Sequence, residues 1–187
     1  NCPTIALSRT ARNTGYKAEY RLHPLSNLYF MRDPMITTAA GLVIGRASTH
    51  QRSGEEKLIR AALAKLQIQP IDAVTSPGTL EGGDFFPAGD TAFIGCGMRT
   101  NEHAIQQLLA RHAFGCARVV VVHDSVHAQE QMHLDTYFNI LDHQLAVLVE
   151  RRLRACKGDP WFLAADVYEW GLDGSGYQCR HRGVSFV

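Results

Sequence analysis

The sequence repeats one pattern, in which a short apolar strand is followed by an amphipathic helix and then by a second apolar strand. In each expected helix, apolar side chains recur every three or four residues and would cover one face. The two copies are expected over 40–45, 55–69 and 71–74, and over 91–95, 101–113 and 119–122. Ser53 and Glu56 also predict a capping box at the start of the first helix. This repetition predicts an α/β fold whose units stack to share one core.

A third copy is expected near the end of the sequence. Its first two strands would cover 139–142 and 145–149, where apolar residues are concentrated. A helix is expected to follow near 161–170. The sequence ends before this third unit would be complete.

The two ends of the sequence suggest a shortened chain. It starts at Asn1 without a methionine and stops on the apolar, strand-like segment 183–187. We therefore expect residues 1–187 to be a single domain truncated at its C-terminus, in a fragment or processed product of a longer protein. Apolar strand surface around Val184 and Phe186 would then be unpaired, which would favour association with the missing portion or with another copy in a homo-oligomer.

Composition narrows the class of partner. The 187 residues are 45% hydrophobic and 20% charged, as in a globular domain with a core. The net charge is +1, and the densest basic stretch is only 151–154, so no basic face for nucleic acid is expected. No apolar run approaches the roughly 20 residues that span a bilayer. Five cysteines without a C-x-x-C pair favour a reducing, cytoplasmic setting over a disulfide framework or a thiolate zinc site. We therefore expect a soluble protein with a small neutral or zwitterionic partner.

Three acidic motifs lie beside apolar runs, at 27–33, 81–84 and 133–135. Carboxylates at strand ends can grip a guanidinium through charge-assisted hydrogen bonds, and a histidine among them can move protons near neutral pH. The glycines at 82 and 83 would allow close backbone approach. Residues 132–138 alternate as in a strand, which would put His133 and Asp135 on one face. Taken singly, these motifs also fit a loop ion pair, a tight turn with solvated acids and a structural histidine.

The order of four motifs, at 27–34, 81–84, 94–100 and 132–138, resembles that of the arginine deiminases of the guanidine-modifying pentein superfamily. The resemblance covers nearly the whole chain from about Asn27 onward. It implies an α/β-propeller of five strand-strand-helix-strand units, of which this chain would cover about half as a partial propeller.

The resemblance also implies roles for single residues. Asp33 and Asp135 would bind the substrate guanidinium, Glu81 would hydrogen-bond it and assist proton movement, and His133 would be the general acid and base. Asn27, Arg52 and Arg99 would hold the backbone groups of the amino acid, the two arginines suiting its carboxylate, and Phe30 and Asp84 would line the site. The implied reaction converts L-arginine to L-citrulline and ammonia through a covalent cysteine intermediate, with no cofactor and no metal.

The nucleophilic cysteine of that family lies in a glycine-rich segment well beyond the His-Leu-Asp motif. The segment after His133 is too short to contain its counterpart, and Cys156 and Cys179 are poor substitutes because their surroundings do not match. We therefore expect these 187 residues to be catalytically silent by themselves.

Other functions remain open from the sequence. An amidinotransferase or a dimethylarginine hydrolase would share the Glu-Gly-Gly-Asp motif, and a non-catalytic module could bind a guanidinium without turning it over. Metal ligation by His123, His127, His133 and Asp135 has plausible ligand types, but their spacing follows no familiar pattern.

Overall fold

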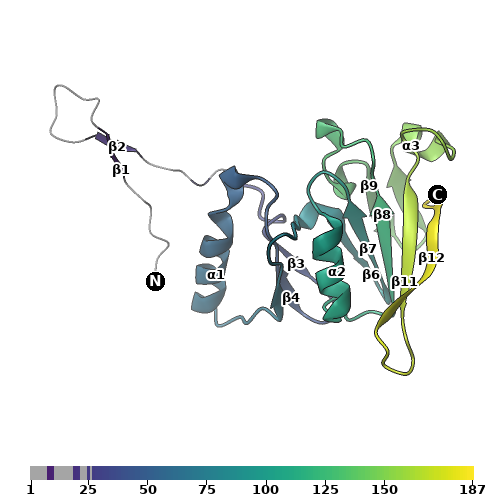
Figure 1. Ribbon diagram of the computed structural model, residues 1–187, viewed down its shortest axis with the longest axis horizontal. Coiled ribbons are helices and arrows are strands. Elements are labelled where there is room, and N and C mark those ends of the chain that lie inside the picture. Colours follow the sequence, from purple (N-terminus) through teal and green to yellow (C-terminus); the bar gives the residue numbers. More distant parts are fainter. Residues whose placement is uncertain (1–7, 11–18, 22–24, 26) are drawn as a thin grey trace.

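The computed structural model describes residues 8–10, 19–21, 25 and 27–187, and Cys2 lies outside these residues (Figure 1). The short strands β1 (Ser8–Thr10) and β2 (Glu19–Arg21) pair antiparallel near the start of the chain. None of the helices in the described residues is long and apolar enough to cross a membrane.

The first strand-strand-helix-strand unit spans β3 (Met35–Thr37), β4 (Leu42–Ile44), α1 (Glu55–Lys65) and β5 (Asp72–Ala73). β3 is antiparallel to β4, and β4 is parallel to β5. Ile44, Ile59 and Leu63 bury the apolar face of α1 against this small sheet, as the helical spacing predicts.

The capping box expected for α1 is wrong. The helix begins after Gly54, which makes no side-chain cap hydrogen bond. The Ser53 hydroxyl instead donates to the carbonyl of His50 at 2.8 Å, and Glu56 pairs with Arg60 at 2.8 Å. A preceding 3-10 turn, His50–Arg52, moves the start of the helix past Ser53.

The second unit spans β6 (Phe85–Ala88), β7 (Thr91–Cys96), α2 (Glu102–Ala110) and β8 (Arg118–His123). β6 is antiparallel to β7, and β7 is parallel to β8. The Asn101 side chain caps α2 by accepting a hydrogen bond from the backbone N–H of Ala104 at 3.1 Å. Both expected repeats are therefore confirmed in their order of elements.

The third expected unit differs. β9 (Phe138–Asp142) and β10 (Leu145–Leu148) form a separate hairpin, followed by the short helix α3 (Glu150–Arg154). The helix expected near 161–170 is wrong, because Ala164–Trp170 forms β11. β11 pairs antiparallel with β8 on one side and with β12 (Tyr177–Ser185) on the other. Pairing on both sides satisfies the backbone groups of this segment, so its local pattern does not decide its structure.

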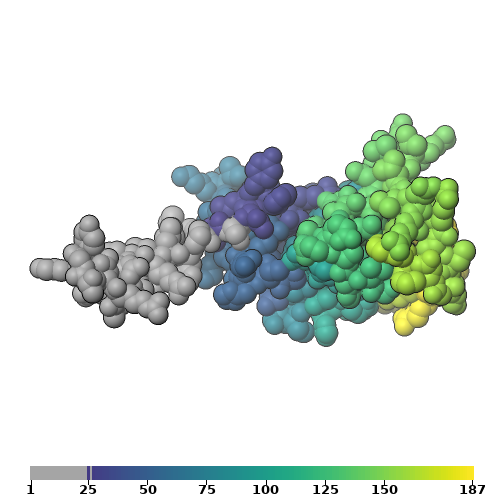
Figure 2. Space-filling view, turned by 90° about the horizontal axis from the view of Figure 1, so that it is seen from above, coloured from purple at the N-terminus to yellow at the C-terminus, as the bar shows by residue number. Residues whose placement is uncertain are grey.

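The larger sheet has the strand order β12-β11-β8-β7-β6, and a separate core lies on each of its faces. On one face, α2 lies over the sheet (Figure 1). Its side chains Ile105 and Leu108 pack in the core with residues of β7 and β8. On the other face, Leu134 and Phe138 pack against Val120 and Val122. Figure 2 shows the two units and the C-terminal strands, coloured blue through yellow, as one continuous body.

The apolar end of β12 is only partly unpaired. Val184 is 40% exposed on this edge strand, as expected. Phe186 instead packs against Phe138 and Phe93, with ring centroids 5.1 and 6.0 Å apart. The expectation for Phe186 is therefore wrong, because its ring completes the core on the face opposite α2.

Candidate active site

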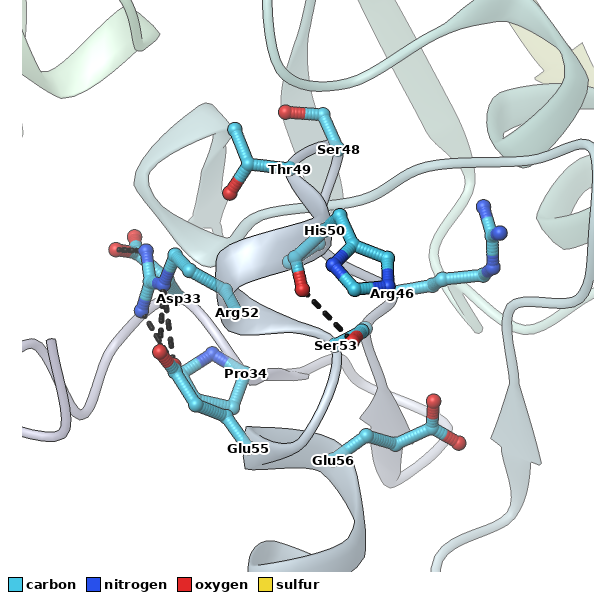
Figure 3. Close-up of a pocket in the computed structure, with 12 residues that line it drawn as sticks. Asp33, Pro34, Arg46, Ser48, Thr49, His50, Arg52, Ser53, Glu55 and Glu56 are labelled. Carbon is cyan, nitrogen blue, oxygen red and sulfur yellow. Dashed lines mark hydrogen bonds and ion pairs between the residues drawn. The ribbon is translucent and has the colours of Figure 1, made fainter. Parts of the chain in front are cut away.

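One cavity of about 570 Å³ brings the acidic motifs together. It is lined by eight of the nine residues that the sequence singles out, namely Asn27, Phe30, Asp33, Arg52, Glu81, Arg99, His133 and Asp135. A neighbouring cavity shares Asp33 and Arg52 with it (Figure 3). Segments separated by about 50 positions therefore meet at one place, as Glu81 and His133 do.

Two glycines make this meeting possible. A Cβ atom on Gly83 would lie 2.6 Å from His133 Nδ1, and one on Gly82 would lie 2.0 Å from the carbonyl oxygen of Arg32. Neither separation is possible for a real side chain, so the expected close backbone approach is confirmed at both positions.

His133 and Glu81 form the central polar pair. His133 Nε2 lies 3.0 Å from Glu81 Oε2, and both side chains are buried. Burial alone would lower the pKa of His133, but the hydrogen bond with Glu81 and the nearby charges of Asp84 and Asp33 raise it overall. Burial likewise would raise the pKa of Glu81, but the hydrogen bonds from His133 and from the Ser48 N–H lower it overall. The pair therefore favours an imidazolium beside a carboxylate.

The segment that carries His133 is a 3-10 turn rather than the expected strand. His133 precedes the turn Leu134–Thr136, and the Thr136 hydroxyl donates to the His133 carbonyl at 2.6 Å. Buried Leu134 anchors this turn in the core. His133 and Asp135 nevertheless line the same cavity, together with Thr136 of the turn.

Asp84 does not line the cavity but supports the turn from behind. Its Oδ1 accepts the backbone N–H of Leu134 at 2.8 Å. Burial raises the pKa of Asp84 to about 7, although a hydrogen bond from Thr100 opposes the shift. The expectation that Asp84 lines the site is therefore corrected, since its carboxylate holds the backbone next to His133.

Asp135 and Asp33 supply the other carboxylates. Asp135 Oδ2 lies 3.4 Å from Arg32 Nε, and burial raises the pKa of Asp135 despite the opposing charges of His133 and Arg32. Asp33 Oδ1 accepts the Gly83 N–H at 3.3 Å and lies 4.0 Å from His133 Nδ1.

Arg52 occupies a different place from the one expected of a residue that binds a substrate carboxylate. Its Nη1 lies 2.6 Å from Asp33 Oδ2 and 3.5 Å from Glu81 Oε2, while Nη2 lies 2.7 Å from Glu55 Oε2. Figure 3 shows Arg52 directed toward Asp33 and Glu55. Burial opposes its charge, but the hydrogen bonds with Glu55 and Asp33 raise its pKa. The carboxylates of the cavity therefore already hold one guanidinium.

The same arrangement bears on metal binding. Ligand atoms of Asp33, Glu81 and His133 lie within 4.8 Å of one another. The Arg52 guanidinium contacts two of these carboxylates, so a cationic side chain already pairs with part of this group.

Arg99 supplies a second cation to the cavity. Its Nη1 lies 3.4 Å from Ser48 Oγ, and its Nε is buried without a hydrogen-bond partner in the described residues. Its Nη2 also lies 3.6 Å from Met132 Sδ, and no salt bridge of Arg99 is found among the described residues. Phe30, which lines the same cavity, is 54% exposed. A guanidinium that lines a cavity without a salt bridge can bind an anionic group of a ligand.

Two site residues were missed from the sequence. Ser48 holds Glu81 Oε1 through its N–H at 3.0 Å and its hydroxyl at 3.1 Å, and no local pattern signals this contact. Glu55 holds Arg52 through a bidentate pair, in which Oε1 accepts from Nε at 3.0 Å and Oε2 accepts from Nη2 at 2.7 Å. Its spacing of three residues from Arg52 is the one signal that could have identified it.

We expect the Glu81–His133 pair to stabilise the protein most between about pH 4.5 and 6.5, the ordinary pKa values of the two groups. The lowered pKa of Glu81 gives stability that is lost as pH falls through its folded value. The raised pKa of His133 gives stability that is lost as pH rises through its folded value. Urea unfolding of the wild type and of Glu81→Gln, measured below, within and above this pH range, gives the difference in their free energies of unfolding. We expect this difference to be largest within the range.

Glu56→Gln is the matched control, since its pair with Arg60 is half exposed and should contribute little at any pH. A Glu81→Gln difference equal at about pH 5.5 and about pH 9 would contradict the assigned pKa directions.

Comparison with known proteins adds family information. The arginine deiminase family model matches residues 3–166. A dimethylarginine dimethylaminohydrolase of Pseudomonas aeruginosa is 30% identical over 115 residues, which cover 61% of this chain and 43% of that protein. An arginine deiminase of Staphylococcus haemolyticus is 32% identical over 136 residues, covering 66% of this chain and 33% of that protein. The chain thus spans less than half the length of these curated relatives.

Solved structures agree with this relationship. The Pseudomonas aeruginosa dimethylarginine dimethylaminohydrolase, as a cysteine-to-serine mutant in complex with citrulline, is 26% identical with a TM-score of 0.57, over 67% of this chain and 48% of that one. The product-bound N-terminal domain of a cyanobacterial arginine dihydrolase is 19% identical with a TM-score of 0.54, over 67% of this chain and 46% of that one, which bears on the fold alone.

Proposed function

This chain belongs to the arginine deiminase family, and from that premise we propose that the whole protein hydrolyses the guanidinium of L-arginine to L-citrulline and ammonia. The observation that carries the proposal is the Glu81–His133 hydrogen bond in a cavity whose carboxylates already hold the guanidinium of Arg52. Asp33 and Glu81 thus show that carboxylates of this cavity pair with a guanidinium, and Asp135 adds a carboxylate that Arg52 does not contact.

The described residues can supply most of the chemistry. Asp135, together with Asp33 and Glu81, would hold the substrate nitrogens, and Arg99 would bind the carboxylate of the amino acid. When a thiolate attacks the guanidinium carbon, a C–S bond forms and the C–N bond to the leaving nitrogen breaks. His133 gives that nitrogen a proton, so that ammonia departs. His133 then takes a proton from water, the resulting hydroxide attacks the same carbon, and the C–S bond breaks to release citrulline.

We assign the thiolate to a cysteine outside the described residues. No cysteine in the described residues lines the cavity. Cys96 and Cys116 have pKa values raised by burial, which opposes thiolate formation. The catalytic constellation proposed for the whole protein is therefore the cavity described above plus a cysteine from elsewhere.

We propose the family propeller as the fold of the whole protein. Two strand-strand-helix-strand units are present here, and five such units around one axis would place the cavity at their centre.

Hydrolysis of dimethylarginine is the second candidate function. It is favoured by the curated dimethylarginine dimethylaminohydrolases of Pseudomonas aeruginosa and Streptomyces coelicolor, which are 30% and 37% identical over the matched residues. Both reactions use the same carbon and the same acid-base pair, and they differ in the amine that leaves.

Product analysis of the whole protein tests the two functions. With L-arginine as substrate, we expect citrulline and ammonia, with kcat/KM at least about tenfold above that for dimethylarginine, because rejecting two added methyl groups is worth at least about 1–3 kcal/mol. The reverse preference, with release of dimethylamine, would identify the second function. Citrulline from neither substrate would contradict both.

A further inference from the structure

A second group of metal-ligating side chains lies away from the candidate active site. Cys96 and His123 are directly opposite each other in the register of the parallel strands β7 and β8. They occupy the last positions of both strands, so their side chains leave the same edge and the same face of the sheet. Glu102, the first residue of α2, lies next to them.

This face differs from the one that carries the His133 turn. Cys96 packs with the core beneath α2, whereas Leu134 of the His133 turn packs in the core on the other face. The two groups share no residue, although Cys96 and His133 both line a small cavity at the end of the sheet.

The separations suit one small cation. Ligand atoms of Cys96, Glu102 and His123 all lie within 4.8 Å of one another. Cys96 Sγ is 3.8 Å from Glu102 Oε2. Two ligands of a tetrahedral zinc ion, with bonds of about 2.3 Å to sulfur and about 2.0 Å to oxygen, are roughly 3.5 Å apart. Small side-chain rotations would therefore bring these groups to bonding distance.

A fourth residue stands behind the histidine. Asp166 Oδ2 lies 3.3 Å from His123 Nε2, and Asp166 is buried in β11. This contact is an ion-pair separation. On a small rotation of the ring, Asp166 would accept the ring N–H, which fixes the tautomer of a metal-binding histidine and leaves its other nitrogen for the ion. Asp166 is itself held by the Gly183 N–H at 2.7 Å.

The local charge also favours a cation. Burial, followed by the carboxylates of Glu102, Asp84 and Asp166, raises the pKa of Cys96 to about 12. A bound divalent ion reverses this effect, because a coordinating thiol is deprotonated. Competing groups are few and peripheral: Gln106 donates to the other oxygen of Glu102 at 2.6 Å, and Arg182 lies 3.9 Å from Asp166 Oδ2.

We propose that Cys96, Glu102 and His123 bind one divalent ion of zinc type, with Asp166 orienting His123. Thiolate and imidazole ligands select such an ion over Mg²⁺ or Ca²⁺. Cys96 and Glu102 flank the loop 97–101, which carries Arg99 to the active-site cavity. The ion joins the two ends of this loop and so fixes the position of Arg99.

Titration with Co²⁺ under anaerobic, reducing conditions tests the site. We expect one Co²⁺ per chain and a thiolate-to-cobalt charge-transfer band in the near ultraviolet. The band reports the sulfur ligand, so it separates this site from the Asp33, Glu81 and His133 group, which has none. Cys96→Ser should abolish the band, and Asp166→Asn should weaken Co²⁺ binding about 10–100-fold.

Cys156→Ser and Cys179→Ser are the matched controls, since these free thiols lie outside the group and their loss should leave the band unchanged. Absence of the band in the wild type, or its survival in Cys96→Ser, would overturn the proposal. If Cys96→Ser lost its folded circular-dichroism spectrum, the Co²⁺ affinity of Glu102→Gln would replace it as the test. The Glu102 side chain is exposed, so this variant should still fold. Undiminished Co²⁺ affinity in that variant would overturn the proposal.

Discussion

Replacing His133 with alanine in the whole protein should lower kcat for its better guanidinium substrate by about 10²–10⁴-fold, the usual contribution of a general acid or base. The expectation rests on the 3.0 Å contact between His133 Nε2 and Glu81 Oε2 inside the cavity. Both the protonation of the leaving amine and the activation of water would lose their proton carrier. Steady-state citrulline production near pH 7 measures the effect.

His143→Ala is the control for this variant, because His143 is exposed in the β9–β10 hairpin and outside the cavity. It should keep close to the full rate. Turnover of His133→Ala within a factor of about two of the wild type, far from the expected loss, would remove His133 from its proposed role.

Arg152→Ala should destabilise the protein by about 3–5 kcal/mol, the range for removing one partner of a buried ion pair. Arg152 is 1% exposed, and its Nη2 lies 2.9 Å from Asp124 Oδ2. Its guanidinium also lies over the rings of Tyr137 and Trp161, at 4.7 and 4.8 Å from their centroids. The alanine variant would leave the Asp124 carboxylate buried without its cation. Urea unfolding monitored by circular dichroism measures the loss.

Arg154→Ala is a closely matched control, since Arg154 is on the same short helix and pairs with Glu150 at the surface. Its loss should cost no more than about 1 kcal/mol. Equal losses of unfolding free energy in the two variants would show that the buried ion pair of Arg152 stabilises the protein no more than the exposed pair of Arg154.

Arg152 also connects stability to the candidate site. Its Nε donates to Gln131 Oε1 at 2.9 Å, two positions before His133. We therefore expect Arg152→Ala both to lower the free energy of unfolding and to change the position of the His133 turn.

Local pattern was sufficient to predict the two repeated units. The spacing of Ile105, Leu108 and Leu109 predicts α2, and the run from Val119 to Val122 predicts β8, because each segment buries its own apolar face. The same reasoning predicted a helix near 161–170, which is wrong. Ala164–Trp170 is a strand because it pairs with β8 and β12. A segment whose partners are distant in sequence carries little of that information in its own periodicity.

The sequence by itself determined which chemistry is available, since the carboxylates, His133 and the paired glycines of the cavity are readable as motifs in order. Only the tertiary structure decided the pairing of charges. Of the basic stretch 151–154, it buries Arg152 and exposes Arg154, and it directs Arg52 to Asp33 and Glu55. Periodicity reports which face of a helix or strand is buried, but an ion pair depends on where two separate segments meet. That meeting is set by the packing of the whole core.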